Sequence, residues 1–360
     1  MDSERDVEAL ALEVRVGSGF EALAGAAALA TGASGTGWPA RLGGRVAAEL
    51  AAQVGDPTGE VWLHLFAAAT DLPGEPDAAA VSAWLAGEDP YRLRRVVVGA
   101  DVPAWQQVVP AGLLDAAAAG EPWAVARMLA DPRHYAGRAA RALAVLAPLD
   151  AGETRRRLVA AFEALRAAMP ERLEGDLVAA QRAFIEDRLP RHRPDPLAVL
   201  DEIAGGFEWT PEPGITRLVV VPQLAGAPAL LLLQHRDARV VGVPVDPAGE
   251  PARLAAAYAA VGDRQRLHIL RLLSHRQLGV SEVARELGTA KSTAHHHLRV
   301  LHRAGLIRLV GQAWRYAYRT RDEAPDALAA RLRLLLSTPP EAAPGPPDAT
   351  PGLADDEETT

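Results

Sequence analysis

Residues 261–320 constrain the fold of this chain more than any other stretch. They begin with an amphipathic pattern, DRQRLHILRLL, whose leucines recur at helical spacing. A second helical stretch, VSEVAREL, ends at Gly288, and a polar helical stretch, AKSTAHHHLRVLHR, follows it. Two short runs rich in Arg and aromatic residues, LIRLV and WRYAYRT, come last and are separated by GQA.

Helices around a glycine turn, followed by a two-stranded ribbon, are the elements of a winged helix-turn-helix, which places its second motif helix in the DNA major groove. Asp263 is suited to cap the first helix and Ser281 the second. Gly288 allows the chain to reverse before the third helix.

The third helix is predicted to read DNA. Its apolar side, formed by Ala294, His297 or Leu298, and Leu301, faces the core. The polar residues gather in its N-terminal half, the end that such a helix presents to base edges. The residues expected at the groove are Lys291, Ser292, Thr293, His295, His296 and Arg299.

The ribbon supplies two further candidates for DNA contact. Arg308 and Arg315 are suited to phosphate or minor-groove contact. Lys291 is the only lysine of the chain, which is consistent with a selected phosphate or guanine contact and equally with chance.

Several linked motifs make this segment resemble the winged helix-turn-helix of ArsR/SmtB-type bacterial transcriptional regulators. The resemblance covers about sixty residues and implies a dimer on an inverted-repeat operator, usually a repressor, with the outer helices of each module forming the dimer interface. The motifs are Asp263–Leu270 (D-x-x-R-x-x-I-L), Val280–Ala284, Ser292–Leu301 and Ala304–Ile307.

Both usual metal sites of that family are missing. Many members bind metal through Cys in the second helix of the motif, but this chain reads GVSEVA there and contains no Cys. Others use Asp and His on the last helix, which here reads DEAPDALAARLRLLL without His. The triplet His295-His296-His297 is no substitute, because consecutive helical residues point about 100° apart and cannot converge on one ion. We therefore expect no metal and no cofactor.

Charge is distributed unevenly. Residues 251–336 hold 15 Lys and Arg against 6 Asp and Glu, a net of +9, which leaves −17 for the remainder because the whole chain carries −8. A basic module on an acidic body is expected when one end faces phosphates. The N-terminus is charged, and no apolar run approaches the ~20 residues of a membrane span. We expect a cytoplasmic protein with double-stranded DNA, and no membrane, as its partner.

The predicted fold class is mainly α: a helical N-terminal body with a small β-meander, followed by a C-terminal winged helix-turn-helix. Three aliphatic runs, TRLVVVP, ALLLLQH and ARVVGVP, supply the meander, and ALALEVRV near the N-terminus is a further candidate strand. Pro170 and Gly175 are expected to divide the long helical stretch 154–189. The predicted units are a helical body at 1–205, the meander packed on it at 206–250, the DNA-binding domain at 251–336, and a disordered acidic, Pro-rich tail at 337–360.

The function of the body stays open at this stage. Its tryptophans either line a pocket for a small-molecule effector or, as we favour, fill a helical core. The body then senses a ligand or partner, or it is a dimerisation or interaction scaffold for a constitutive DNA-binding module. No enzyme is expected, because recognisable catalytic motifs are missing and the histidines at 64, 134, 192 and 235 stand in unrelated contexts.

Overall fold

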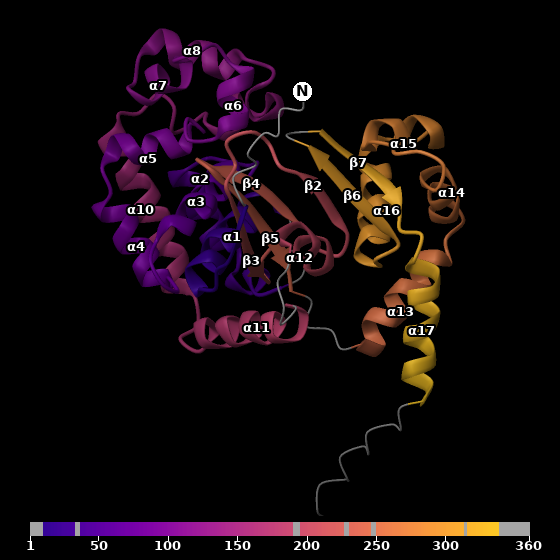
Figure 1. The fold of residues 1–360 in the computed structure, drawn as a ribbon. Helices are drawn as coiled ribbons and strands as arrows, with labels where there is room; N and C mark the ends of the chain where they lie inside the picture. Colours follow the sequence, from indigo (N-terminus) through magenta and orange to yellow (C-terminus); the bar gives the residue numbers. More distant parts are fainter. Residues whose placement is uncertain are drawn as a thin grey trace, which may run out of the picture.

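Helices predominate in the described part of the chain, as the sequence predicts (Figure 1). The structure consists of a helical body, a small sheet and a C-terminal helix-strand module, which confirms the predicted fold class. The predicted tail, 337–360, lies outside the described residues except for Ser337, which ends the last helix. The computed structural model describes residues 10–32, 37–189, 195–226, 230–245, 250–312 and 315–337.

Aspartate side chains cap the N-termini of some of the body helices. Asp77, Asp89 and Asp150 each accept a hydrogen bond from the backbone N–H three residues further on, which satisfies a donor that the helix leaves free. The body helices are α1 (Ser18–Ala30), α2 (Gly44–Gln53), α3 (Glu60–Ala68), α4 (Ala78–Gly87), α5 (Pro90–Val97), α6 (Pro103–Val108), α7 (Leu113–Ala118), α8 (Pro122–Ala130), α9 (Ala139–Ala142), α10 (Ala151–Ala168), α11 (Leu173–Arg188) and α12 (Pro196–Ile203), with 3-10 turns at Pro39–Leu42, Ala69–Asp71 and His134–Gly137.

Only one of the two predicted breaks in the stretch 154–189 occurs. Helix α10 ends at Ala168, shortly before Pro170. Gly175 lies inside α11, so its prediction as a break was wrong. A glycine weakens a helix by only about 1 kcal/mol, whereas proline removes a hydrogen bond and clashes with the preceding turn.

The predicted aliphatic runs form a four-stranded sheet, but its connectivity is not that of a meander. Strands β1 (Ala11–Val14), β3 (Arg217–Gln223), β5 (Ala238–Pro244) and β4 (Leu231–His235) lie in the order β1-β3-β5-β4. The pairs β1/β3 and β3/β5 are parallel, and β4/β5 is antiparallel. The predicted N-terminal strand therefore joins this sheet. Burial on both faces explains the continuous apolar runs of β3 and β5, since parallel strands covered on both sides show no alternation.

The two faces of this sheet belong to different cores. Val219, Val221 and Val240 join the large core formed with the body helices. Leu218 and Val241 face the other way, into a core that also contains residues of the C-terminal module. Figure 1 shows the sheet between these two parts of the molecule.

The C-terminal module has a core of its own. Ile269, Leu298 and Ile307 are fully buried there, and each comes from a different element. The elements are α13 (Glu250–Val261), α14 (Arg264–Leu273), α15 (Val280–Leu287), α16 (Lys291–Arg303), β6 (Ile307–Gln312), β7 (Arg315–Thr320) and α17 (Ala324–Ser337).

A short strand that the sequence did not reveal, β2 (Phe207–Thr210), extends the ribbon. It pairs in parallel with β6, and β6 pairs antiparallel with β7, so the second sheet has the order β2-β6-β7. The start of the predicted 206–250 unit therefore pairs with the module and not with the four-stranded sheet. The predicted domain boundaries themselves stay predictions.

Candidate nucleic-acid interface

The helix-turn-helix is built from α15, a glycine turn and α16. Asp263 caps α14, as predicted, by accepting from the backbone N–H of Arg266 at 2.9 Å. Ser281 does not cap α15, because the helix begins one residue earlier and Gly279 is the N-cap. The Glu282 carboxylate reaches back and accepts from the Gly279 N–H at 2.8 Å. Gly288 ends α15 with a φ of +64°, the left-handed conformation that favours glycine.

Helix α16 divides into a buried and an exposed face, as the sequence predicts. Ala294, Leu298 and Leu301 are completely buried. His297 is also buried, at 8 % exposure, so both members of the predicted alternative face the core. The six residues predicted at the groove, which are Lys291, Ser292, Thr293, His295, His296 and Arg299, are all exposed.

The histidine triplet separates between these two faces. The rings of His296 and His297 lie 5.9 Å apart at a steep angle, and only His297 points inward. Desolvation of its partly covered ring lowers the pKa of His295, and the nearby Arg299 and His296 lower it further. Among the residues that the structure describes, no group of three or more His, Cys, Asp or Glu side chains is placed to hold a metal ion.

The ribbon of β6 and β7 is the wing of the winged helix-turn-helix, and its two predicted DNA contacts, Arg308 and Arg315, have different surroundings. Arg315 is exposed at the start of β7, opposite Gln312 and next to the turn of the ribbon. Arg308 lies at the opposite end of the ribbon, and only 19 % of its side chain is exposed. It forms ion pairs at 3.2 Å with Asp201 and with Glu323, and one at 3.6 Å with Glu208. A phosphate contact by Arg308 would require these pairs to open.

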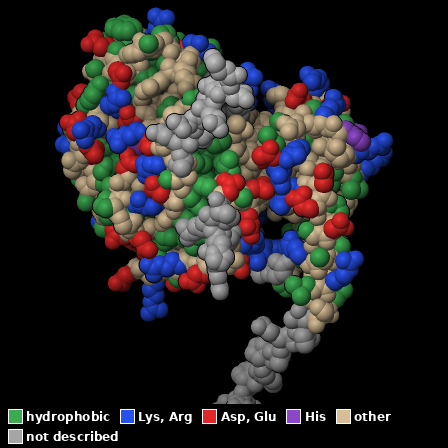
Figure 2. All heavy atoms as spheres, in the orientation of Figure 1, with side chains coloured by type: hydrophobic (Ala, Val, Ile, Leu, Met, Phe, Trp, Pro, Cys, Tyr) green, Lys and Arg blue, Asp and Glu red, His purple; other side chains and the backbone are tan. Residues whose placement is uncertain are grey.

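Other basic side chains of the module are exposed together with those of α16. Figure 2 shows histidine beside Lys and Arg side chains at the right-hand edge of the module. Arg264 and Arg271 on α14 and Arg285 on α15 are exposed as well. The net positive charge of the module therefore lies at its surface, where it can act on phosphates.

Three of the histidines that stand in unrelated sequence contexts in fact lie close together in the body. His64, His134 and His235 are each less than 7 % exposed. The His64 Nδ1 lies 2.7 Å from the hydroxyl of Tyr135, and the ring of His134 lies 4.5 Å from that of Tyr135. Burial lowers the pKa of His64 to about 3 and that of His134 to about 4, so both are neutral core residues at pH 7. His192 lies outside the described residues.

The tryptophans of the body mostly fill its core, which is the interpretation that we favour from sequence. Trp62 is completely buried, and Trp38 and Trp209 are less than 8 % exposed. Trp84 and Trp105 pack at the edge of the core. Trp123 is the exception, at 58 % exposure.

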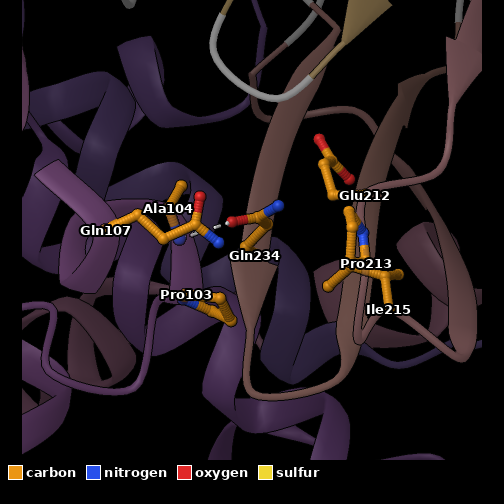
Figure 3. A pocket seen from close by; sticks show the side chains of 7 residues that line it. All are labelled: Pro103, Ala104, Gln107, Glu212, Pro213, Ile215 and Gln234. Carbon is orange, nitrogen blue, oxygen red and sulfur yellow. Dashed lines mark hydrogen bonds between the residues drawn. The ribbon is translucent and has the colours of Figure 1, made fainter.

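Neither of two cavities in the body is lined by tryptophan. One lies between α6 and the residues before β3, where the backbone N–H of Ala104 donates to the Gln234 side chain at 3.2 Å (Figure 3). Its volume of about 10 Å³ suits about one water molecule. The other measures about 260 Å³ and lies between α1 and α2, where Leu29, Leu50 and Pro57 make its wall largely apolar.

Comparison with known proteins identifies the module. Residues 263–308 match the family described as bacterial regulatory protein, arsR family. They form an ArsR-family domain. The match runs from the N-cap of α14 through the exposed face of α16 to the start of β6, and covers about one eighth of the chain. A long N-terminal extension precedes the ArsR-family domain.

The ArsR-family domain makes the protein a DNA-binding transcription regulator. Searches of curated proteins and of solved structures gave no significant match. Within the described residues, no helix has both the length and the apolar character to cross a membrane.

Proposed function

We propose that the protein is a cytoplasmic, homodimeric transcriptional repressor that binds an inverted-repeat operator without a metal, and that it is not an enzyme. The exposed polar face of α16, which lies within the ArsR-family match, carries the proposal. In this arrangement the N-terminal half of α16 enters the major groove, and Arg315 contacts the backbone beside it.

Exposed apolar side chains on the outer helices support the homodimer. Helices α13 and α17 pack against each other. Tyr258 on α13 is 38 % exposed, and Leu334 and Leu336 on α17 are 67 % and 76 % exposed. Large apolar side chains that stay exposed on these two helices are available for an interaction with another chain. In the proposed dimer a second copy of the chain covers them and sets the two reading helices about 34 Å apart, one turn of DNA.

In this proposal the protein senses its effector through the body. The chain has no Cys and its last helix has no His, so the DNA-binding module lacks the residues with which related regulators sense metal. The apolar cavity beside α1 is large enough for a small molecule, although it lies below the size range of most drug-sized sites. The alternative is a constitutive DNA-binding protein whose body is a scaffold. A thermal-shift screen of metabolites separates the two: sensing requires a compound that both stabilises the protein and changes its operator affinity.

The DNA-binding proposal is tested after selection of the operator from random DNA. We expect His296→Ala or Arg299→Ala to weaken specific binding by about 1–3 kcal/mol, because a base contact is lost. Arg315→Ala should weaken binding to all sequences and flatten its salt dependence. Arg92→Ala removes one positive charge from the body, where the side chain is 71 % exposed, and is the matched control. Unchanged operator affinity in all three module variants would refute the proposal.

A further inference from the structure

The ribbon of the C-terminal module is completed by β2, a strand that follows the helical body and precedes the module in the chain. Strand β2 pairs with β6 from Phe207↔Leu309 to Thr210↔Gln312, so it reaches the end of β6 next to the wing turn. The backbone N–H of Leu309 also donates to the Gly206 carbonyl at 2.8 Å. An unpaired edge would leave these backbone groups open to other chains, and here the body satisfies them. We use the name junction for Asp201 and residues 205–210, which link the end of α12 to β6.

A common hydrophobic core joins the junction, the wing and the sheet of the body. Phe207 is fully buried and Trp209 is 4 % exposed. They share their core with Leu309 of β6 and with Leu218 of the four-stranded sheet, and Tyr316 of β7 packs against it. Closely packed cores transmit displacements because they contain few voids that could absorb them.

Ion pairs reinforce the same contact. Arg308 at the base of β6 pairs with Asp201 and Glu208, and Arg319 of β7 also pairs with Glu208. In Figure 2, acidic and basic side chains meet along the line where the body faces the module. Glu208 therefore contacts both strands of the wing from its place in the junction.

The junction also contacts the end of the reading helix. His302, in the last turn of α16, lies against the backbone of Gly206. Gly206 has a φ of +95°, and a Cβ there would lie 3.2 Å from the Arg321 side chain and 3.5 Å from the Arg308 backbone. The chain passes through this corner because glycine accepts the φ and needs no room for a side chain.

We propose that the junction is the element through which the body positions both the wing and the reading helix, with Glu208 as a positioning residue for DNA binding. This inference rests on the proposed function. The junction is hydrogen-bonded to β6 of the wing and lies against His302 of α16. A change in the body that moves α12 or β2 therefore shifts the wing relative to α16. The body thereby controls how well Arg315 and the exposed face of α16 fit DNA at the same time.

Glu208→Gln is the variant that tests this, with Glu202→Gln as its matched control. Glu202 lies at the end of α12, is exposed, and loses the same charge without an ion pair to the wing among the described residues. The first measurement is hydrogen exchange of the β6 amides in the full chain without DNA. We expect roughly three- to tenfold faster exchange in Glu208→Gln, since two partly exposed ion pairs are lost, and unchanged exchange in Glu202→Gln.

The second measurement is a double-mutant cycle with Arg315→Ala in operator binding. Arg315 lies at the other end of the ribbon from the Glu208 ion pairs. If the two substitutions acted independently, the factors by which each weakens operator binding would multiply. If the junction positions the wing, Arg315→Ala should weaken binding about tenfold in the wild-type and Glu202→Gln backgrounds, but threefold or less in the Glu208→Gln background.

The outcomes separate this inference from the proposed function. Unchanged β6 exchange in Glu208→Gln overturns the inference, and so does faster exchange combined with a full effect of Arg315→Ala. If the wild-type chain selects no DNA sequence, the proposed function falls, and the exchange measurement alone decides whether the body strand holds the wing.

Discussion

The buried ion pair between Arg239 and Glu212 gives the sharpest test of the packing between body and wing. The Arg239 side chain at the start of β5 is 3 % exposed, and the Glu212 side chain after β2 is 10 % exposed. The guanidinium also lies 5.4 Å from the ring of Trp209, whose indole N–H donates to Glu212 at 3.1 Å. Glu212→Gln keeps the shape of this site but leaves a buried positive charge without its counter-charge.

We expect Glu212→Gln to lower the free energy of unfolding by about 3 kcal/mol. Removing one partner of a buried ion pair costs about 3–5 kcal/mol, because the remaining charge keeps its desolvation penalty. The lower end applies here because the Trp209 ring still faces the guanidinium and the amide oxygen of Gln can still accept a hydrogen bond. The Tyr316 side chain also hydrogen-bonds Arg239, whereas the Nε of Arg239 has no hydrogen-bond partner among the described residues.

Urea unfolding, followed by far-UV circular dichroism and by tryptophan fluorescence, measures this loss. A loss of stability lowers the urea concentration at half unfolding and leaves the dependence of the unfolding free energy on urea unchanged. Glu202→Gln should change stability by less than about 0.5 kcal/mol, as expected for an exposed side chain. The double variant Arg239→Met/Glu212→Leu should recover most of the stability, since both charges are then removed. A loss below 1 kcal/mol in Glu212→Gln, or a double variant less stable than the single one, would refute the reasoning.

Three further predictions concern the body, the dimer and the helix-turn-helix. Burial raises the pKa of Glu21 to about 7 from its ordinary 4.5, so protonated Glu21 stabilises the folded state below pH 4.5 and this stabilisation is lost as the pH rises to 7. The difference in unfolding free energy between the wild type and Glu21→Gln should therefore fall by about 3 kcal/mol over that range. Denaturation at several pH values measures it. Leu336→Glu should give a monomer in analytical ultracentrifugation, whereas Leu267→Glu, which changes an exposed leucine on α14, should leave the dimer intact. Gly288→Ala should lower the free energy of unfolding by about 1 kcal/mol, because Gly288 has a positive φ. Gly175→Ala should raise it by up to about 1 kcal/mol, because Gly175 lies inside α11 with open space for a methyl group. Thermal unfolding measures both.

The helix-turn-helix could be predicted because its signals are local. The spacing of Ala294, Leu298 and Leu301 assigns one side of α16 to the core, and the structure leaves the predicted polar residues exposed on the other. Asp263 and Gly288 mark a helix start and a turn through chemistry that acts within a few residues. The cap of α15 was misplaced by two residues, because a glycine cap closed by Glu282 has no side-chain signature of its own.

The connectivity of the sheets was not predicted from the local sequence patterns. The continuous apolar runs of β3 and β5 contained a signal for parallel strands buried on both faces, which the meander prediction did not use. Strand β2 has four residues, too few to show an alternation, and its partner β6 lies about a hundred residues away along the chain.

The sequence by itself determined the class of the C-terminal module, the face of α16 that it leaves exposed, and the loss of the usual metal sites of the ArsR family. Only the tertiary structure decided that Arg308 is held in ion pairs at the base of the wing while Arg315 stays exposed near its turn. It also gathered His64 and His134 into one buried cluster and joined the body to the wing through Phe207. The physical reason is the range of the interactions: helical periodicity and capping act over one or two turns, whereas ion pairs, strand pairing and shared cores depend on residues that only folding brings together.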